Sequence, residues 1–257
     1  VGENDYIDDD KIDLTAMQEN LSSYKGKTST SSPSPHEWEN AFGDADVVFC
    51  ITITSSLSGT YNSAVIAKDI YEHNHTGRKV YVLDSLSTGP EIALFIEKIA
   101  ELIKAGFTPD DIYKTLLEYK DKTHLYFSLA SLNNFAKNGR ISPVIAAGIG
   151  LLGVRVVGKA SDEGTLLPLD KCRGEKRALK KLIDHLKECA YTDGKIIIAH
   201  NNNEAGALEL KKLIENTFGI FNGKIQKTRA LCSYYAEPGS LLIGFEASLC
   251  NHKPYKD

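Results

Sequence analysis

The chain has 257 residues, of which 42% are hydrophobic and 25% charged, and its formal net charge is −4. These values are typical of a globular protein and exclude an intrinsically disordered or membrane-embedded chain. The charges are spread along the sequence without a basic block, so we expect no nucleic-acid partner. The longest apolar stretch, residues 144–154, is too short for stable membrane insertion.

The five cysteines form an odd-numbered set without a C-x-x-C pair or a histidine at metal-ligand spacing. This pattern predicts neither a disulfide framework nor a metal site, and a reducing, cytoplasmic location fits it best. The sequence has neither the G-x-G-x-x-G nor the G-x-x-x-x-G-K-[ST] pattern, so we expect no nucleotide cofactor.

Residues 1–122 alternate between predicted strands and helices. Apolar runs at residues 47–53 and 79–83 are typical of buried parallel strands, and helical patterns begin after Gly59, at Glu91 and at Thr108. Such alternation predicts an α/β, Rossmann-like first domain, in which a parallel sheet has helices on both faces.

Residues 123–257 have a different pattern, which predicts a second, α+β domain. We expect strands at residues 125–128, 195–199, 224–231 and 241–245, and helices at 131–138, 175–189 and 203–218. Tyr235 lies in the run Tyr-Tyr-Ala-Glu-Pro-Gly at residues 234–239, which we interpret as a turn between two strands.

Three loops of the first domain are rich in hydroxyl groups. They contain Thr30 and Ser31, then Ser55, Ser58 and Gly59, and finally Ser85. In an open parallel sheet the ligand lies beyond the carboxyl ends of the strands, so at least two of these loops should face one crevice. Together with amides at a helix start they suit a phosphate or carboxylate. The alternative is that each hydroxyl cluster only caps a helix.

Arg140 follows a predicted helix end, and its guanidinium could pair with an anion, although a surface ion pair would explain it equally well. A nucleophilic serine is a rival interpretation of Ser58. The sequence around Ser58 lacks the G-x-S-x-G elbow, and no histidine occupies an evident partner position.

The serine-rich loops and several short motifs, taken in order, resemble the DegV family, which includes the FakB proteins that present fatty acids to a fatty acid kinase. The similarity covers about residues 6–245 and is carried by five segments: residues 30–34, 55–61, 84–89, 139–142 and 171–174. The resemblance implies a long-chain fatty acid in an apolar tunnel between the two domains, with its carboxylate at Thr30 and Ser58. Arg140 would lie at the tunnel mouth, where the family meets its kinase.

The chain departs from the family pattern H-x-G-P-G, because Tyr235 replaces the histidine and Glu237 replaces a glycine. A phenol can donate a hydrogen bond to a carboxylate but cannot carry a positive charge, and Glu237 could repel an anion. These changes keep open a carrier of another elongated apolar anion, beside a serine-dependent hydrolase or transferase. The family's opening strand is also absent before Val1, so we expect the sequence to be incomplete at that end.

Overall fold

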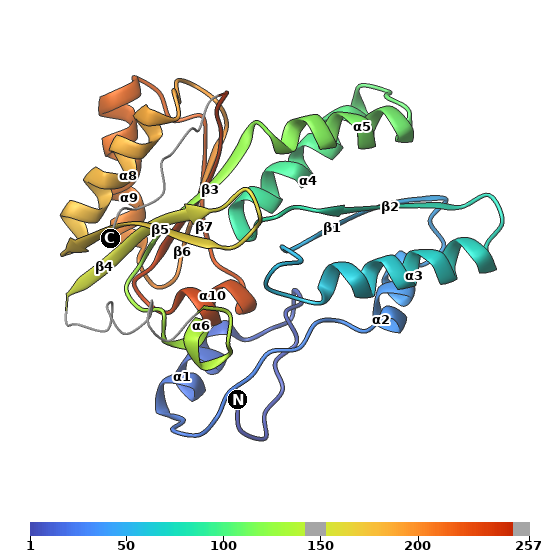
Figure 1. Ribbon diagram of the computed structural model, residues 1–257, viewed down its shortest axis with the longest axis horizontal. Coiled ribbons are helices and arrows are strands. Elements are labelled where there is room, and N and C mark those ends of the chain that lie inside the picture. Colours follow the sequence, from blue (N-terminus) through green and yellow to red (C-terminus); the bar gives the residue numbers. More distant parts are fainter. Residues whose placement is uncertain (142–152, 249–257) are drawn as a thin grey trace.

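The computed structural model describes residues 1–141 and 153–248, which form two lobes (Figure 1). The first lobe contains a parallel pair of strands, β1 (Val47–Thr52) and β2 (Lys79–Asp84), in register from Val47 opposite Lys79 to Thr52 opposite Asp84. Four helices belong to this lobe: α2 (Pro35–Phe42), α3 (Thr60–Asn74), α4 (Gly89–Lys104) and α5 (Pro109–Lys120).

The strand pleat divides the apolar residues of β1 and β2 between two helical layers. Cys50, Val80 and Val82 pack with residues of α2 and α3, whereas Leu83 packs with residues of α4 and α5. Because successive side chains of a strand point to opposite faces, both faces of this sheet are covered. The prediction of a parallel sheet with helices on both faces is therefore confirmed.

The starts of α2 and α5 follow from local chemistry. Ser34 and Glu37 form a capping box at α2, and the Thr108 hydroxyl accepts a hydrogen bond from the Asp111 amide at α5. Both helices have proline in their first turn, where its missing N–H costs nothing. These signals set where each helix begins, and Phe42 of α2 and Ile112 of α5 pack in apolar clusters with strand residues.

The second lobe is built on a six-stranded mixed sheet with the order β5-β4-β3-β8-β6-β7. Only the β6–β7 pair is parallel, and the other neighbours are antiparallel. The strands are β3 (Thr123–Leu129), β4 (Val154–Ala160), β5 (Leu166–Arg173), β6 (Ile196–His200), β7 (Gly223–Lys227) and β8 (Leu241–Glu246). The predicted α/β architecture with a second, α+β region is confirmed, whereas the domain boundary at residues 122 and 123 stays a prediction.

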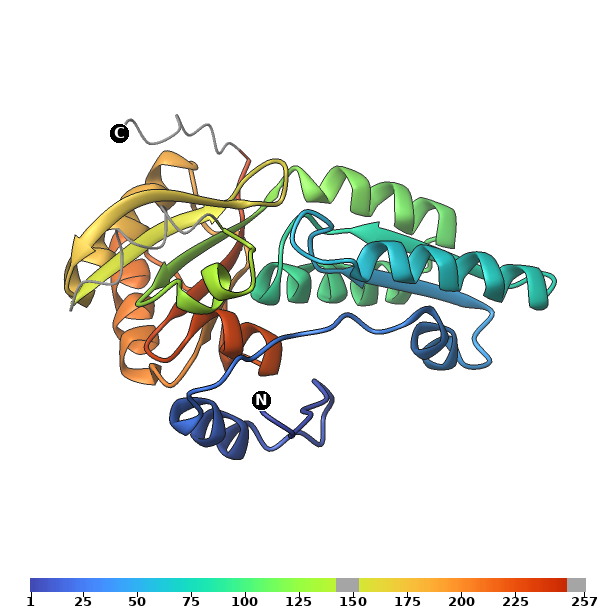
Figure 2. The same ribbon diagram turned by 60° about the horizontal axis from the view of Figure 1, so that its bottom comes forward.

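The two faces of this sheet are covered differently. Helices α8 (Glu175–Glu188) and α9 (Glu204–Phe218) lie on the outer face (Figure 2). Their buried side chains and those of the sheet form the largest apolar core. The other face carries a smaller apolar cluster, which we call the inner apolar face. Two short helices, α6 (Asn133–Lys137) and α10 (Ala230–Ala236), lie at its edge. The inner apolar face consists of Leu125, Phe127, Leu129, Leu132, Val156, Ala199, Ala236 and Leu242.

Helix α4 contacts both sheets. It packs on β1 of the two-stranded sheet and on β3, β6 and β8 of the six-stranded sheet. The contact with β8 is made at Gly244, where an added Cβ would lie 2.5 Å from the Glu91 backbone nitrogen. Glu91 itself is buried and accepts a 2.8 Å hydrogen bond from the Thr123 hydroxyl. The start of α4 is thus fixed between the lobes.

The N-terminal segment crosses from the second lobe to the first. Helix α1 (Leu14–Ser23) lies beside α10, and the chain then runs in front of α10 to reach α2 (Figure 2). Gln18 donates a 2.8 Å hydrogen bond to the side chain of Asn201 at the end of β6. Among the described residues, no helix combines the length and the apolar character that crossing a bilayer requires.

Several local predictions were wrong. Residues 230–236 form α10 rather than part of a strand and a turn, and β7 ends at Lys227. The β4–β5 hairpin and helices α1 and α2 were not predicted. Cys50, Cys172 and Cys232 are free, whereas Cys189 is disulfide-bonded. The disulfide was not predicted, because sequence spacing alone does not reveal which cysteines meet. The apolar stretch at residues 144–154 lies mostly outside the described residues.

Candidate ligand-binding site

Three loops at the carboxyl ends of β1 and β2, and before α2, adjoin one another. We call them the first (residues 28–34), second (residues 54–59) and third (residues 85–88) hydroxyl loops. The first and second loops are connected through α3, because the Ser63 hydroxyl donates a 2.6 Å hydrogen bond to the Pro33 carbonyl. The first-loop hydroxyl of Ser32 lies 3.8 Å from where a Cβ on Gly59 would be.

Hydrogen bonds join the second loop to the third loop and to the end of β2. The Thr54 amide donates to the Ser87 carbonyl over 2.9 Å, and the Ser55 amide donates to the Asp84 carboxylate over 3.1 Å. The parallel pairing of β1 with β2 dictates this arrangement, since both strands end at the same edge. The second and third loops therefore lie side by side, whereas the expectation that at least two hydroxyl loops face one crevice stays a prediction.

Helix α10 of the second lobe contacts the first hydroxyl loop through two tyrosines. The Tyr235 hydroxyl lies 2.8 Å from Thr30 Oγ1, and the Tyr234 hydroxyl lies 2.6 Å from Thr28 Oγ1. Cys232, on the same helix, lies 3.5 Å from the Thr88 hydroxyl of the third loop. A short helix of the second lobe thereby contacts two of the three hydroxyl loops.

Arg140 connects the same helix to the second hydroxyl loop. Its guanidinium lies 5.9 Å from the centre of the Tyr235 ring, and its Nε donates to the Leu57 carbonyl over 3.4 Å. Its Nη1 donates to the Asn138 carbonyl over 2.7 Å. A cation over an aromatic face is attracted by the ring's electron density. Arg140 and Tyr235 therefore place one positive charge and one phenol beside the loops.

The remaining predicted site residues differ in how deeply they are buried. Ser58 is half-buried, and its hydroxyl lies 2.7 Å from that of Thr60. Ser31 and Ser55 are exposed, and Ser85 is buried, with its hydroxyl accepting the Ser87 amide. The structure thus brings Thr30, Tyr235 and Arg140 into one cluster beside the loop of Ser58 and Gly59. It turns the Ser85 hydroxyl toward its own loop instead.

The helix-capping alternative explains only part of the hydroxyl groups. Ser34 caps α2, and the Ser58 hydroxyl accepts from the Thr60 amide at the start of α3, as that alternative requires, but Thr88, the N-cap residue of α4, makes no side-chain cap hydrogen bond. The first turn of a helix leaves amides without intrahelical acceptors, and these amides favour anions. The start of α3, which borders the second loop, is consequently suited to an anionic group.

The hydrogen bonds of Ser58 bear on the nucleophile alternative. Within the described ranges, its Oγ is bonded to the Thr60 side chain and amide and to no histidine or lysine side chain. An activated serine requires a base within hydrogen-bond reach. In the part of the chain that the structure describes, no group of three His, Cys, Asp or Glu side chains is arranged to hold a metal ion.

Tyr234 was considered from the sequence as a second phenol that could reach a ligand, whereas the roles of Leu57 and Asn138, which complete the cluster, were missed. Asn138 donates a 2.8 Å hydrogen bond to the Tyr234 hydroxyl. The buried residues Ala230, Ser233 and Tyr234 of α10 are spaced three and four positions apart, as on one face of a helix. This spacing was the sequence signal that could have predicted α10. The Glu-Pro-Gly sequence that follows concealed it.

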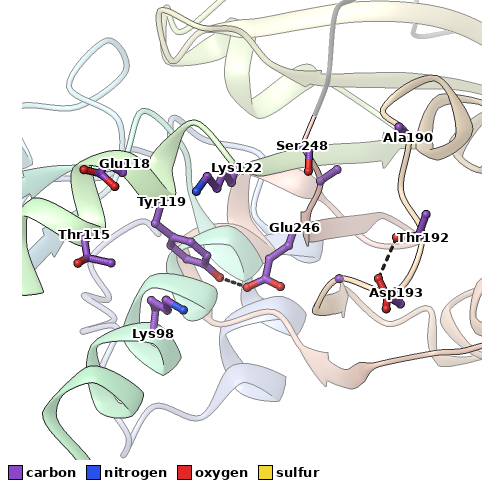
Figure 3. Close-up of a pocket in the computed structure, with 12 residues that line it drawn as sticks. Lys98, Thr115, Glu118, Tyr119, Lys122, Ala190, Thr192, Asp193, Glu246 and Ser248 are labelled. Atoms are coloured by element: carbon purple, nitrogen blue, oxygen red, sulfur yellow. Dashed lines mark hydrogen bonds between the residues drawn. The ribbon is translucent and has the colours of Figure 1, made fainter. Parts of the chain in front are cut away.

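A cavity of about 390 Å³ lies at the opposite end of β8 from α10 (Figure 3). Its principal polar groups have protein partners, since the Tyr119 hydroxyl donates to Glu246 over 2.5 Å and the Lys195 amide donates to the same carboxylate over 2.9 Å. Burial raises the pKa of the Tyr119 phenol. None of the predicted site residues lines this cavity. It is separate from the cluster at α10.

A sequence model described as "Uncharacterised protein, DegV family" matches residues 1–248. The chain belongs to the DegV family. A DegV domain-containing protein of Streptococcus pneumoniae is 40% identical over 246 residues, which are 96% of this chain and 88% of the relative. The family relationship suggested by the hydroxyl loops is confirmed.

Solved DegV structures have the same fold. The Fatty Acid Kinase (Fak) B3 protein of Streptococcus pneumoniae, loaded with linoleic acid, is 40% identical with a TM-score of 0.94, covering 96% of this chain and 88% of its own. A DegV family protein from Eubacterium eligens, loaded with heptadecanoic acid, is 39% identical with a TM-score of 0.93, covering 96% and 90%. Both DegV relatives were crystallised with a fatty acid.

Proposed function

We propose that this protein binds one long-chain fatty acid in the cytoplasm and presents it to a fatty acid kinase, without catalysing a reaction itself. The observation that carries the proposal is the position of the Thr30, Tyr235 and Arg140 cluster at the edge of the inner apolar face. The cluster of hydroxyls and guanidinium suits a carboxylate, and the inner apolar face suits an acyl chain. The fatty acids in the Streptococcus pneumoniae and Eubacterium eligens relatives support this ligand class.

The carboxylate would be held by hydroxyls and one cation. Thr30 and Tyr235 each have a hydroxyl that can donate, and Arg140 lies beside the ring of Tyr235. The half-buried Ser58 and the amides at Gly59 and the start of α3 would complete the cradle. These donors matter because a buried carboxylate without partners is strongly disfavoured.

The acyl chain would lie in a tunnel between the lobes, along the inner apolar face. Phe135, Ile141, Ala160 and Leu166 are partly buried residues that border this face and could contact the ligand. Each buried methylene contributes about 0.8 kcal/mol, so a long acyl chain can supply most of the binding free energy. The polar cradle would then determine the orientation of the ligand.

The proposal is tested by lipid extraction and mass spectrometry on protein purified from a bacterial host. We expect about one fatty acid per chain on the wild type and a clear reduction in a Thr30→Ala, Ser58→Ala double variant. A Ser22→Ala, Thr115→Ala double variant removes two hydroxyls outside the cluster and should keep the ligand. A different bound anion would favour a carrier of another elongated apolar molecule, and wild-type protein that binds no fatty acid would refute the proposal.

A second measurement separates the carrier from a serine-dependent enzyme. After incubation with fatty acyl esters, the carrier should release no free acid above the rate of a Ser58→Ala variant. Ester hydrolysis that disappears in this variant would support the hydrolase or transferase instead. Purified fatty acid kinase and ATP should convert the bound acid to acyl phosphate, which tests the presentation step.

A further inference from the structure

Glu237 adopts a backbone conformation that is unusual for a residue with a side chain. It follows α10 with φ 59° and ψ 161°. This region is populated almost exclusively by glycine, because a Cβ is crowded by the neighbouring backbone. The sequence motif of the family has glycine at this position. The glutamate is therefore kept in a strained conformation by contacts of its own.

These contacts are with the start of α6. The Oε1 atom of Glu237 accepts a 2.9 Å hydrogen bond from the Ser131 hydroxyl and a 3.1 Å hydrogen bond from the Asn134 backbone amide. The N-cap residue of α6, Leu132, makes no side-chain cap hydrogen bond. The Ser131 hydroxyl accepts from the Asn133 amide, and Glu237 supplies the acceptor for the Asn134 amide from another part of the chain. An anion is favourable at this end of a helix.

The other end of α6 leads directly to the proposed cradle. Asn138, which follows α6, accepts a hydrogen bond from Arg140 and donates one to the Tyr234 hydroxyl. The side-chain amide of Asn134 also donates to the Tyr234 carbonyl over 2.7 Å. Helix α6 is thus attached to α10 at both ends, and at its N-terminal end Glu237 and the Asn134 side chain share the attachment.

We propose that Glu237 is a positioning residue, which holds α6 against α10 so that Arg140 stays over the ring of Tyr235. Its carboxylate is engaged by Ser131 and the Asn134 amide and does not act on the ligand itself. Replacement of the family glycine thereby adds a connection that the glycine cannot make. This inference rests on the proposed fatty-acid site, since Arg140 and Tyr235 are assigned to it.

The test compares four variants by calorimetric titration of delipidated protein with oleate. Glu237→Gln keeps an oxygen that can accept both hydrogen bonds and should bind within about twofold of the wild type. Glu237→Ala keeps the Cβ and its backbone strain but loses both bonds, and should bind about tenfold more weakly. Ser131→Ala removes one donor to Glu237, together with the acceptor of the Asn133 amide, without changing the backbone at residue 237, and should also weaken binding.

Glu237→Gly separates positioning from stability. Glycine relieves the backbone strain, so this variant should unfold at a temperature equal to or above that of Glu237→Ala. It should still bind oleate as weakly as Glu237→Ala. In nuclear magnetic resonance spectra of the free protein, the Arg140 Nε–H signal, assigned with Arg140→Lys, should shift in the alanine and glycine variants and remain in Glu237→Gln.

The outcomes distinguish this inference from the function on which it rests. Wild-type protein that binds no oleate overturns both. Wild-type binding together with equal affinity of Glu237→Ala, or failure of glutamine to rescue binding, overturns only the positioning role. An Arg140 Nε–H signal that is unchanged in Glu237→Ala would also overturn only the positioning role.

Discussion

The Tyr235 hydroxyl lies 2.8 Å from Thr30 Oγ1, although the two residues are 205 positions apart in the sequence. This hydrogen bond joins α10 of the second lobe to the first hydroxyl loop. Each hydroxyl has one proton, so a carboxylate at this point could accept from both only by replacing the hydrogen bond between them. The replacement of the family histidine by tyrosine therefore preserves a donor and changes its charge.

Removal of the Tyr235 hydroxyl should weaken ligand binding. Tyr235→Phe keeps the ring beneath Arg140 and loses only the hydrogen bond to Thr30 or to the ligand. We expect oleate affinity to fall by about five- to tenfold, the usual effect of one lost hydrogen bond. Calorimetric titration measures the change, and Tyr24→Phe, at an exposed tyrosine, is the matched control. Equal affinities of the two variants would contradict a role for the phenol.

Restoring the family histidine should introduce a pH dependence. An ordinary histidine has a pKa of about 6.5, so Tyr235→His would gain a positive charge as the pH falls from 8 to 5.5. A carboxylate ligand would then bind more tightly at low pH than at high pH, relative to the wild type. Oleate titrations at four pH values test this. Parallel pH profiles of variant and wild type would show that residue 235 does not face the carboxylate.

Glu91 should make stability depend on pH. Burial raises its pKa from 4.5 to about 7, so the folded state holds the proton more tightly than the unfolded state. The resulting stabilisation is complete below about pH 4.5 and is lost as the pH rises to about 7. The free energy of unfolding of Glu91→Gln minus that of the wild type should therefore increase by about 3 kcal/mol over this interval.

Urea denaturation at several pH values measures this difference, and Glu118→Gln, at an exposed glutamate, serves as the control. A difference that stays constant between pH 4.5 and 7 would mean that Glu91 titrates normally in the folded protein.

Gly244 should tolerate no side chain. A Cβ there would lie 2.5 Å from the backbone of both Pro90 and Glu91, so α4 would have to move away from β8. We expect Gly244→Ala to reduce the free energy of unfolding by about 3 kcal/mol, as overpacking of a rigid contact does. Gly59→Ala is a suitable comparison, because its φ is −72° and the nearest atom is 3.8 Å from the added Cβ. Equal stability of the two variants would contradict the close approach of α4.

Asp8 should stabilise α10 from the N-terminal segment. Its two carboxylate oxygens accept from the Ala230 amide over 3.1 Å and the Leu231 amide over 3.0 Å. Asp8→Ala removes this cap and should cost about 1 kcal/mol of stability, measured by thermal unfolding. Asp9→Ala is the matched control, since the Asp9 carboxylate accepts from the amide of nearby Lys11 and is exposed. An effect of equal size in both variants would mean that the cap contributes nothing specific.

The α/β architecture and the neighbouring hydroxyl loops could be predicted because they depend on local patterns. Apolar runs identify β1 and β2, and parallel pairing places the ends of both strands at one edge. Helix α10 could not be predicted in this way, because Asp8 caps it from more than two hundred residues away. The strands β4 and β5 were missed for a related reason. Gly158 and Pro168 interrupt their pattern, and the pairing that stabilises them is a tertiary contact.

Helix α4 packs on strands of both sheets, and Gly244 lets its first turn approach β8 closely. The two lobes therefore share α4. A hinge motion that opened them would have to separate α4 from one of the two sheets. That motion would expose buried side chains such as Leu94 and Phe95. A ligand that enters between the lobes must accordingly pass through a local rearrangement at the rim while the two halves keep their relative orientation.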